Sequence, residues 1–289
     1  MIGHIGVLAA LAAMICWGIG DFLIQKATRK LGDIESIFFI GFLGSVALFP
    51  FIYNDLPNIF SNTNLLWTLI FLGFTMLIVS IVNFQSLKEG KIAIVEPILE
   101  TELPITIFLA FIVLQEKLSL LQILLAALVF AGIILISVSK IKIKSKQILE
   151  KGAFLAVFAA FGFGFLNFFT GSIARITSPL LAIWSMWTLC FICCFAYLLY
   201  KKGLKKIIGD AKKSHKLILS VGFFDTATWV FFAVSMVNLP ISLATAITES
   251  YPAIAVLLGI VVNKEVVKTH QFAGMSLALL ASIALALTI

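Results

Sequence analysis

Ten apolar stretches, most of them about 20 residues long, dominate this 289-residue sequence. A helix of about 20 residues spans the roughly 30 Å hydrocarbon layer of a membrane and satisfies its backbone hydrogen bonds internally. Soluble domains usually carry about a quarter charged residues, whereas 12% are charged here and 61% are hydrophobic. A membrane β-barrel would show shorter, alternating strands. We therefore predict an all-α membrane protein with about ten transmembrane helices.

Clusters of charged, proline and asparagine residues separate the apolar stretches. We predict spans near 5–25, 34–53, 65–86, 92–114, 119–139, 152–174, 179–200, 217–237, 241–262 and 270–289. We expect the first to be retained rather than cleaved as a signal peptide, because the basic residues follow it instead of preceding it. Spans five and ten carry no acidic residue, so we expect them to brace the bundle or to mediate contact in a homodimer.

The basic residues are distributed asymmetrically. All of the 21 lysines and arginines except Lys117 and Arg175 fall in the loops that follow spans one, three, five, seven and nine. Positively charged loops stay in the cytoplasm, so we expect both termini to face outward from the cell (plasma) membrane. The lysine-rich loops 140–151 and 201–216 are expected to contact anionic lipid headgroups. The net charge of +7 therefore does not imply nucleic acid as a partner.

The two halves of the chain repeat each other. A shift of 149 residues aligns Glu100 with Glu249, Glu116 with Glu265, and Gln122 with Gln271. Nearer the start of each half, an offset of 144 residues aligns Gly18 and Gly20 with Gly162 and Gly164. Unrelated apolar helices do not often share acids and glutamines at one constant offset.

Each repeat holds five spans, an odd number, so the second repeat must lie upside down relative to the first. Many secondary transporters are built from such inverted repeats. We expect the first five-helix repeat at 1–140, a lysine-rich cytoplasmic linker at 141–151, and the second repeat at 152–289.

Acidic residues inside apolar spans are costly and usually functional. Glu100 and Glu249 lie about 12 Å along spans four and nine at 1.5 Å per residue, so the inverted repeat places both near the middle of the bilayer. The candidate substrate- or proton-binding acids are Glu100, Glu249, Glu96 and Asp21, and Glu102 and Asp225 also lie inside spans. The alternative is that these carboxyls are protonated and only hydrogen-bond neighbouring helices.

Prolines accompany the acids of spans four and nine, where Pro97, Pro104 and Pro252 occur. A proline lacks the backbone N–H and bends a helix. Helices broken near the middle of the membrane are typical of the substrate sites of transporters. We therefore expect Pro97, Pro104 and Pro252 to break the helices beside the acids.

Aromatic and neutral polar side chains are candidates to complete the site. The aromatic candidates are Trp17, Trp229 and Tyr251, together with Phe161, Phe163, Phe165, Phe231 and Phe232. An acid with aromatic walls binds an ammonium group through cation–π contact, although phenylalanine is also an ordinary lipid-facing residue. The polar candidates are Asn83, Gln85, Asn167, Ser235, Thr245 and Thr248, which would hydrogen-bond either a ligand or a neighbouring helix.

No metal or cofactor is expected. Cys190, Cys193 and Cys194 include a C-x-x-C spacing, but they lie in an apolar run with no histidine nearby in sequence. We expect them to be packing residues rather than metal ligands or redox centres.

Three motifs together point to a known family. They are Trp17-Gly18 in the first span, echoed by Phe161-Gly162; Pro104 followed by Gln115-Glu116-Lys117-Leu118 and Gln122; and Pro252 followed by Lys264-Glu265, Gln271 and Gly274. The layout resembles the drug/metabolite transporter superfamily, in particular its ten-helix EamA-domain members. The resemblance implies a carrier of amino acids, nucleotide-like metabolites, sugars or toxic organics, proton-linked or exchanging, with a cavity formed by spans one to four and six to nine. Members are commonly described with cytoplasmic termini, the reverse of what the lysines predict here.

We expect a secondary active transporter that moves a small polar metabolite, such as an amino acid, amine or sugar, by alternating access. One alternative is an intramembrane aspartyl protease, because Gly18-Ile19-Gly20-Asp21 has the G-x-G-D form and Asp225 supplies a second acid. The order of the two acids and the lack of an aspartate after Gly164 disfavour it. A passive channel is the other alternative.

Overall fold

The computed structural model describes residues 2–89, 95, 98–137, 151–201, 203–254, 257 and 268–289. Over these residues the regular structure is entirely helical. The helices are α1 (Ile2–Leu31), α2 (Asp33–Ile52), η1 (Tyr53–Asp55), α3 (Leu56–Ser61), α4 (Thr63–Glu89), α6 (Glu102–Val113), α7 (Leu120–Ser137), α9 (Lys151–Ile176), α10 (Pro179–Tyr200), α11 (Leu204–Asn238), α12 (Ile241–Thr248) and α14 (Thr269–Ala286). Among these described residues, eight helices are long and apolar enough to cross a membrane, and α6 is a shorter apolar helix.

Most predicted spans correspond to one continuous helix, but spans four and nine do not. In span four, a turn at Glu100 and Thr101 precedes α6. In span nine, α12 ends at a turn formed by Glu249 and Ser250, and a helical turn follows at 251–254. Of the predicted linker 141–151, residues 141–150 lie outside the described residues, and Lys151 is the first residue of α9.

The inverted repeat is visible in the pairing of α7 with α14, which are equivalent helices of the two halves. Gln122, near the start of α7, donates to Thr288 Oγ1 at the end of α14 (3.2 Å). Gln271, near the start of α14, donates to the carbonyl of Ile136 at the end of α7 (3.2 Å). Each glutamine also accepts a hydrogen bond from the backbone amide three residues before it, at 3.0 and 3.2 Å. Because equivalent helices run antiparallel, the two halves are inverted, and the predicted fold class is confirmed.

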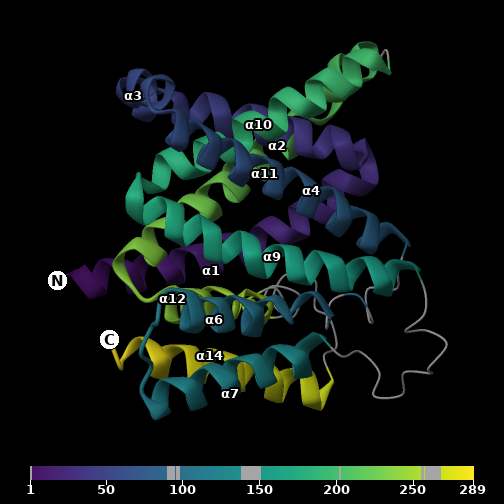
Figure 1. Cartoon of the computed structure of the whole chain (residues 1–289). Coiled ribbons are helices and arrows are strands. Elements are labelled where there is room, and N and C mark those ends of the chain that lie inside the picture. The colour runs from purple at the N-terminus through teal and green to yellow at the C-terminus, as the bar shows by residue number, and fades with distance from the viewer. Residues whose placement is uncertain are drawn as a thin grey trace.

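The helices pack in layers that obey the same symmetry (Figure 1). The antiparallel pair α7 and α14 forms one outer layer, and the short helices α6 and α12 lie against it. Next to them, α9 packs on α6 and on α4, just as α1 packs on α12 and on α11. The equivalent helices α2 and α10 pack on each other on the far side of the molecule. The broken helices therefore lie between the outer pair and the rest of the bundle.

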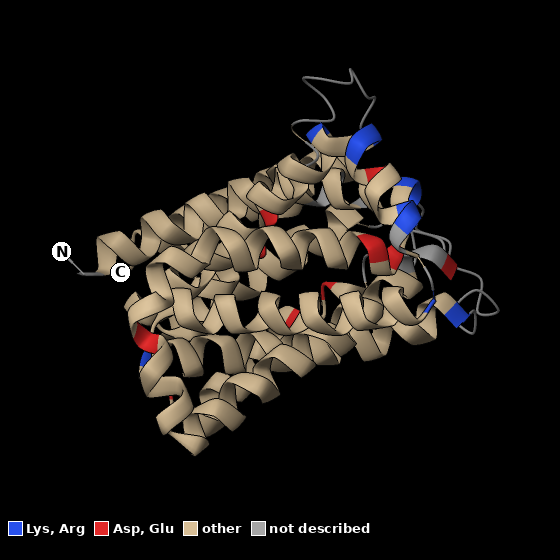
Figure 2. Ribbon diagram, turned by 90° about the horizontal axis from the view of Figure 1, so that it is seen from above, with Lys and Arg blue, Asp and Glu red and all other residues tan. Residues whose placement is uncertain are grey.

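Charged residues mark the two ends of the bundle (Figure 2). Lysines and arginines gather at one end, here called the lysine end, where Lys151 pairs with Glu89 and Lys206 pairs with Glu35. Both chain termini lie at the opposite end, here called the terminus end (Figure 2). The fold thus places the termini at the end opposite to most of the described lysines, as their distribution along the sequence predicts.

Candidate functional site: two broken helices

Both short helices are interrupted at equivalent positions, Glu100 and Glu249. Thr101 donates its amide and its hydroxyl to the carbonyl three residues earlier, at 3.1 and 2.6 Å. Ser250 does the same in the other half, at 3.3 and 2.6 Å. Bonds to the third residue back tighten the chain and interrupt the α-helical ladder. Thr101 and Ser250 were not predicted as site residues, although their offset of 149 residues was a signal in the sequence.

Prolines restart both helices after these turns. Pro104 is the third residue of α6, and Pro252 is the second residue of the helical turn at 251–254. In the first turn of a helix, the N–H that proline lacks has no intrahelical acceptor, so proline is tolerated there. The carbonyl of Glu100, four residues before Pro104, accepts from the preceding amide instead, at 3.4 Å. Pro97 and Glu96 lie outside the described residues.

The two glutamates are buried near the middle of the bundle. Glu100 is 3% exposed and Glu249 is fully buried. All eight residues of α12 are buried, so Glu249 follows a helix that is surrounded by protein. Glu249 lies about 12 Å along the helix from Ile241, and Glu100 about 20 Å from Val113, the residues of α12 and α6 at the terminus end, at 1.5 Å per residue. In a hydrocarbon layer of roughly 30 Å, both depths are close to the middle.

Four aromatic rings gather beside the second broken helix. Trp17 stacks on Tyr251, with 5.5 Å between ring centroids, and also contacts Trp229 at 5.4 Å and Phe232 at 5.6 Å. We call Trp17, Trp229, Phe232 and Tyr251 the aromatic cluster. Its member Tyr251 is two residues along the chain from Glu249, and aromatic faces attract organic cations. Phe161 and Phe165 are exposed instead.

Close packing of α1 and α9 on the broken helices confirms the symmetry but corrects one detail. A Cβ at Gly164 would lie 2.5 Å from Ile105 and 3.2 Å from the backbone oxygen of Glu102. A Cβ at Gly18 would meet Ile254 and the backbone oxygen of Tyr251 in the other half. These two residues are equivalent to Ile105 and Glu102 at the offset of 149 residues. Gly18 therefore corresponds to Gly164, and the predicted match with Gly162 was wrong by two residues.

The two halves of the site differ in chemistry. With the corrected alignment, the positions equivalent to the aromatic cluster are Ser80, Asn83, Glu102 and Phe163. Three of the four aromatic positions are therefore polar in the first half. Glu102 and Ser80 are buried, and the buried Oδ1 of Asn83 finds no hydrogen-bond partner among the described residues.

Neutral polar groups line the contact between α9 and α12. A Cβ at Gly171 would lie 2.7 Å from Ile241, so α9 and α12 touch there. One turn deeper along each helix are Asn167 and Thr245, which are fully buried. Both atoms of the Asn167 amide and the hydroxyls of Thr245 and Thr248 have no hydrogen-bond partner among the described residues. Such groups are costly inside a membrane, so they are suited to hydrogen-bond a polar ligand.

Two further acidic candidates, Asp225 and Asp21, lie on other helices. Asp225 is 6% exposed in α11, and Asp21 lies in α1 with a side chain that the structure does not describe. Within the described ranges, no group of three or more histidine, cysteine, aspartate or glutamate residues could hold a metal ion.

A separate polar cavity of about 470 Å³ lies at the terminus end. Its lining consists of Asp55, Asn58, Asn62, Asn64, Leu65, Thr68, Ile176, Thr177, Ser178 and Leu181. None of these residues was predicted to belong to the site, and none lies on α6 or α12.

Comparison with known proteins agrees with the repeated fold. The model of the EamA-like transporter family matches residues 4–138 and again residues 150–287. No curated protein matches in a sequence comparison. A protein of known crystal structure aligns with 97% of this chain and 96% of its own, with a TM-score of 0.74 and 12% identity. At that identity the likeness shows the fold alone.

Proposed function

Because the chain belongs to the EamA-like transporter family, we propose that it is a secondary active transporter that works by alternating access. The observation that carries the proposal is the paired interruption of α6 and α12 at two buried, equivalent glutamates. Two inverted halves that share one central site can open it first to one side and then to the other. The broken helices supply the carboxyl groups and backbone polar groups at that site.

The substrate that fits this site is a small polar molecule with a cationic group, such as an amine or an amino acid. Glu100 and Glu249 provide negative charge, and the aromatic cluster provides a wall for an ammonium group. Asn167 and Thr245 provide hydrogen-bonding groups that the described residues leave unused. Carboxyls at this depth also suit proton transfer, so we propose that substrate and protons exchange at the glutamates.

The proposal extends to the placement of the protein. We propose that the lysine end faces the cytoplasm and that both termini lie outside the cell membrane, because basic loops resist translocation. Contact between the lysine loops and anionic headgroups is part of the proposal. So is a homodimer in which the outer pair α7 and α14 mediates the contact.

A carrier is favoured over the two alternatives. A channel requires a continuous aqueous path, whereas the glutamates and α12 are buried in protein. A protease with Asp21 and Asp225 as its acids is an enzyme, whereas the family that the chain belongs to is one of transporters. Saturable flux with trans-stimulation would support the carrier, and conductance steps would support the channel.

The test uses purified protein reconstituted in proteoliposomes. A thermal-shift screen at several pH values first identifies a ligand, because a bound ligand raises apparent stability. Uptake of that ligand is then measured with and without a pH gradient in Glu100→Gln, Glu249→Gln and the control Glu89→Gln, which removes an exposed acid from the Lys151 pair. We expect both central variants to lose pH-dependent uptake while remaining folded, and the control to retain it. Undiminished uptake in both central variants would contradict the proposal.

A further inference from the structure

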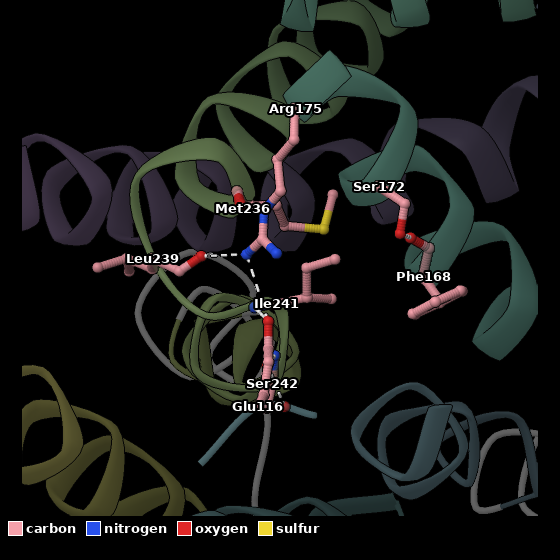
Figure 3. Close-up of polar contacts among 8 residues, drawn as sticks. All are labelled: Glu116, Phe168, Ser172, Arg175, Met236, Leu239, Ile241 and Ser242. Atoms are coloured by element: carbon pink, nitrogen blue, oxygen red, sulfur yellow. Dashed lines mark hydrogen bonds and ion pairs between the residues drawn. The ribbon is translucent and has the colours of Figure 1, made fainter. Parts of the chain in front are cut away.

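A compact polar cluster joins the two halves of the protein at the terminus end (Figure 3). Arg175, in the last turn of α9, donates from Nε to the carbonyl of Met236 (2.8 Å) and from Nη2 to the carbonyl of Leu239 (2.7 Å). These carbonyls belong to the last turn and the cap of α11. A cation at the C-terminal end of a helix is favoured by the helix dipole and by the free carbonyls.

Glu116 binds the start of the next helix in the same cluster. Its Oε1 accepts from the amide of Ile241 (2.7 Å), and its Oε2 accepts from the amide and the hydroxyl of Ser242 (3.1 and 2.7 Å). These are the first residues of α12. The carboxylate also pairs with Arg175 at 3.3 Å, and its side chain is only 9% exposed. An anion thus caps the N-terminal end of α12, where the helix dipole favours it.

The cluster crosses the boundary between the repeats. Glu116 belongs to the first half, whereas Arg175, α11 and α12 belong to the second. Gln115, the residue before Glu116, has a φ of 53°, and its left-handed backbone turns the chain at the end of α6. The contacts between Glu116 and Ile241 join positions that are 125 residues apart.

We propose that Glu116 and Arg175 form the gate that holds the terminus end closed. The inference rests on the proposed function, because alternating access requires that the two halves separate at this end. Separation pulls the end of α6 away from the start of α12, and the hydrogen bonds of Glu116 to Ile241 and Ser242 oppose that movement. α12 leads directly to Glu249, so release of its N-terminal end exposes the central site from this side.

The gate is tested by access to a cysteine, with no substrate and no proton gradient. Thr248→Cys is placed in a background in which Cys16, Cys190, Cys193 and Cys194 are replaced by serine or alanine. The probe lies about 10 Å along α12 from the gate at 1.5 Å per residue. A membrane-impermeant maleimide is then added from each side of sealed vesicles of known orientation, before and after introduction of Glu116→Gln.

We expect Glu116→Gln to speed labelling from the terminus end about tenfold, the factor that corresponds to a 1.4 kcal/mol shift between two states. Labelling from the lysine end should slow, because the two halves open alternately. The matched control is Glu89→Gln, which breaks an ion pair of similar length, 3.0 Å, at the lysine end, and its labelling rates should equal those of the parent.

Two results would overturn the gate. One is an unchanged labelling rate in folded Glu116→Gln protein. The other is faster labelling from the terminus end with no slowing from the lysine end, which indicates that α12 merely frays without its cap. If Glu116→Gln does not fold, Arg175→Lys provides the second variant, since it keeps the charge but loses the planar fork that bonds two carbonyls. It should show the same two shifts at smaller size, and unchanged rates there would also overturn the proposal.

The proposed gate and the proposed transport site can be refuted independently of each other. Labelling reports only the opening of the terminus end, so it can support the gate even if Glu100→Gln and Glu249→Gln transport normally. Loss of uptake in those two variants, with no effect of Glu116→Gln on labelling, supports the transport site and removes the gate.

Discussion

Replacement of Gly18 by alanine tests whether α1 must touch the second broken helix. A Cβ at Gly18 would lie 2.8 Å from Ile254 Cβ and 3.1 Å from the backbone oxygen of Tyr251. Carbon atoms pack best at about 3.5–4.0 Å. Ile254 Cβ is fixed by its backbone and the other contact is a backbone atom, so neither can rotate away. The new methyl group must therefore push α1 and the broken helix apart.

The magnitude follows from two opposing effects. Overpacking of a tight core costs about 1–3 kcal/mol. Alanine in place of glycine inside a helix stabilises the folded state by roughly 0.8–1.0 kcal/mol through its higher helix propensity. Gly20→Ala is the matched control, because it lies in the same helix and its new Cβ would come no closer than 3.8 Å, to Phe224. The difference between the two variants thus isolates the clash, and Gly18→Ala should be the less stable by about 1–3 kcal/mol.

The assay is thermal unfolding of purified protein followed by tryptophan fluorescence. Trp17 precedes Gly18 and stacks on Tyr251, so its emission also reports the separation of the two elements. We expect a lower melting temperature and an altered emission spectrum for Gly18→Ala, and an unchanged or higher melting temperature for Gly20→Ala. Equal stability of the two variants would refute the reasoning, because the close approach would then not constrain the fold.

Three further outcomes are expected. Gln271→Ala should lower the free energy of unfolding by about 1 kcal/mol, because α14 loses its cap and its bond to the end of α7. Chemical denaturation measures this loss, with Gln85→Ala at an exposed position as the control. Gln115→Gly should be tolerated, whereas Gln115→Val should destabilise the protein by about 1–2 kcal/mol, because the backbone φ is 53° at this residue. The melting temperatures of the two variants test this difference. Trp17→Ala should raise the KM for a cationic substrate more than Trp17→Phe does, because only phenylalanine keeps an aromatic face on Tyr251; uptake kinetics provide the comparison.

The gross fold could be predicted because its signals are local. Long apolar stretches specify membrane helices wherever they occur, and an odd number of spans per repeat forces the inversion. The break in span nine was predictable as well, because Pro252 cannot continue the hydrogen-bond ladder of α12. What the prolines do not give is the residue at which the chain turns. Thr101 and Ser250 set that position through bonds to the carbonyl three residues back.

The alignment of α1 with α9 could not be obtained from the residues alone. Both helices carry a G-x-G pattern, so a slip of two residues still places one glycine on another. Only contacts distinguish the two registers, because Gly18 and Gly164 are the glycines that meet equivalent positions of the broken helices. Loops of unequal length permit such a slip between helices without changing the offset of 149 residues elsewhere.

The role of Glu116 was also hidden from sequence reasoning. The offset identified it as one of the repeated acids, but its partners lie 59 residues away at Arg175 and 125 residues away at Ile241. A signal was present nonetheless: Arg175 and Lys117 are the two lysine or arginine residues that fall outside the loops after spans one, three, five, seven and nine. A lone arginine at an end that is otherwise poor in basic residues requires nearby acceptors, which the cluster provides.

The two halves share a backbone more closely than they share side chains, and the proposed mechanism explains why. Opening one end is the inverted image of opening the other, so the turns at Glu100 and Glu249 must have equivalent geometry. Thr101 and Ser250, which form these turns, lie at the same offset of 149 residues as the glutamates. In the proposed mechanism the surroundings of the turns contact the substrate, and the substrate need not be symmetric. A molecule with an ammonium group and a polar tail is matched by the aromatic cluster on one side and by Ser80 and Asn83 on the other. Asn83→Phe gives the first half the aromatic residue that the second half has at the equivalent position, Phe232. This variant should therefore weaken uptake of polar substrates relative to apolar cations, whereas the control Asn83→Gln should not.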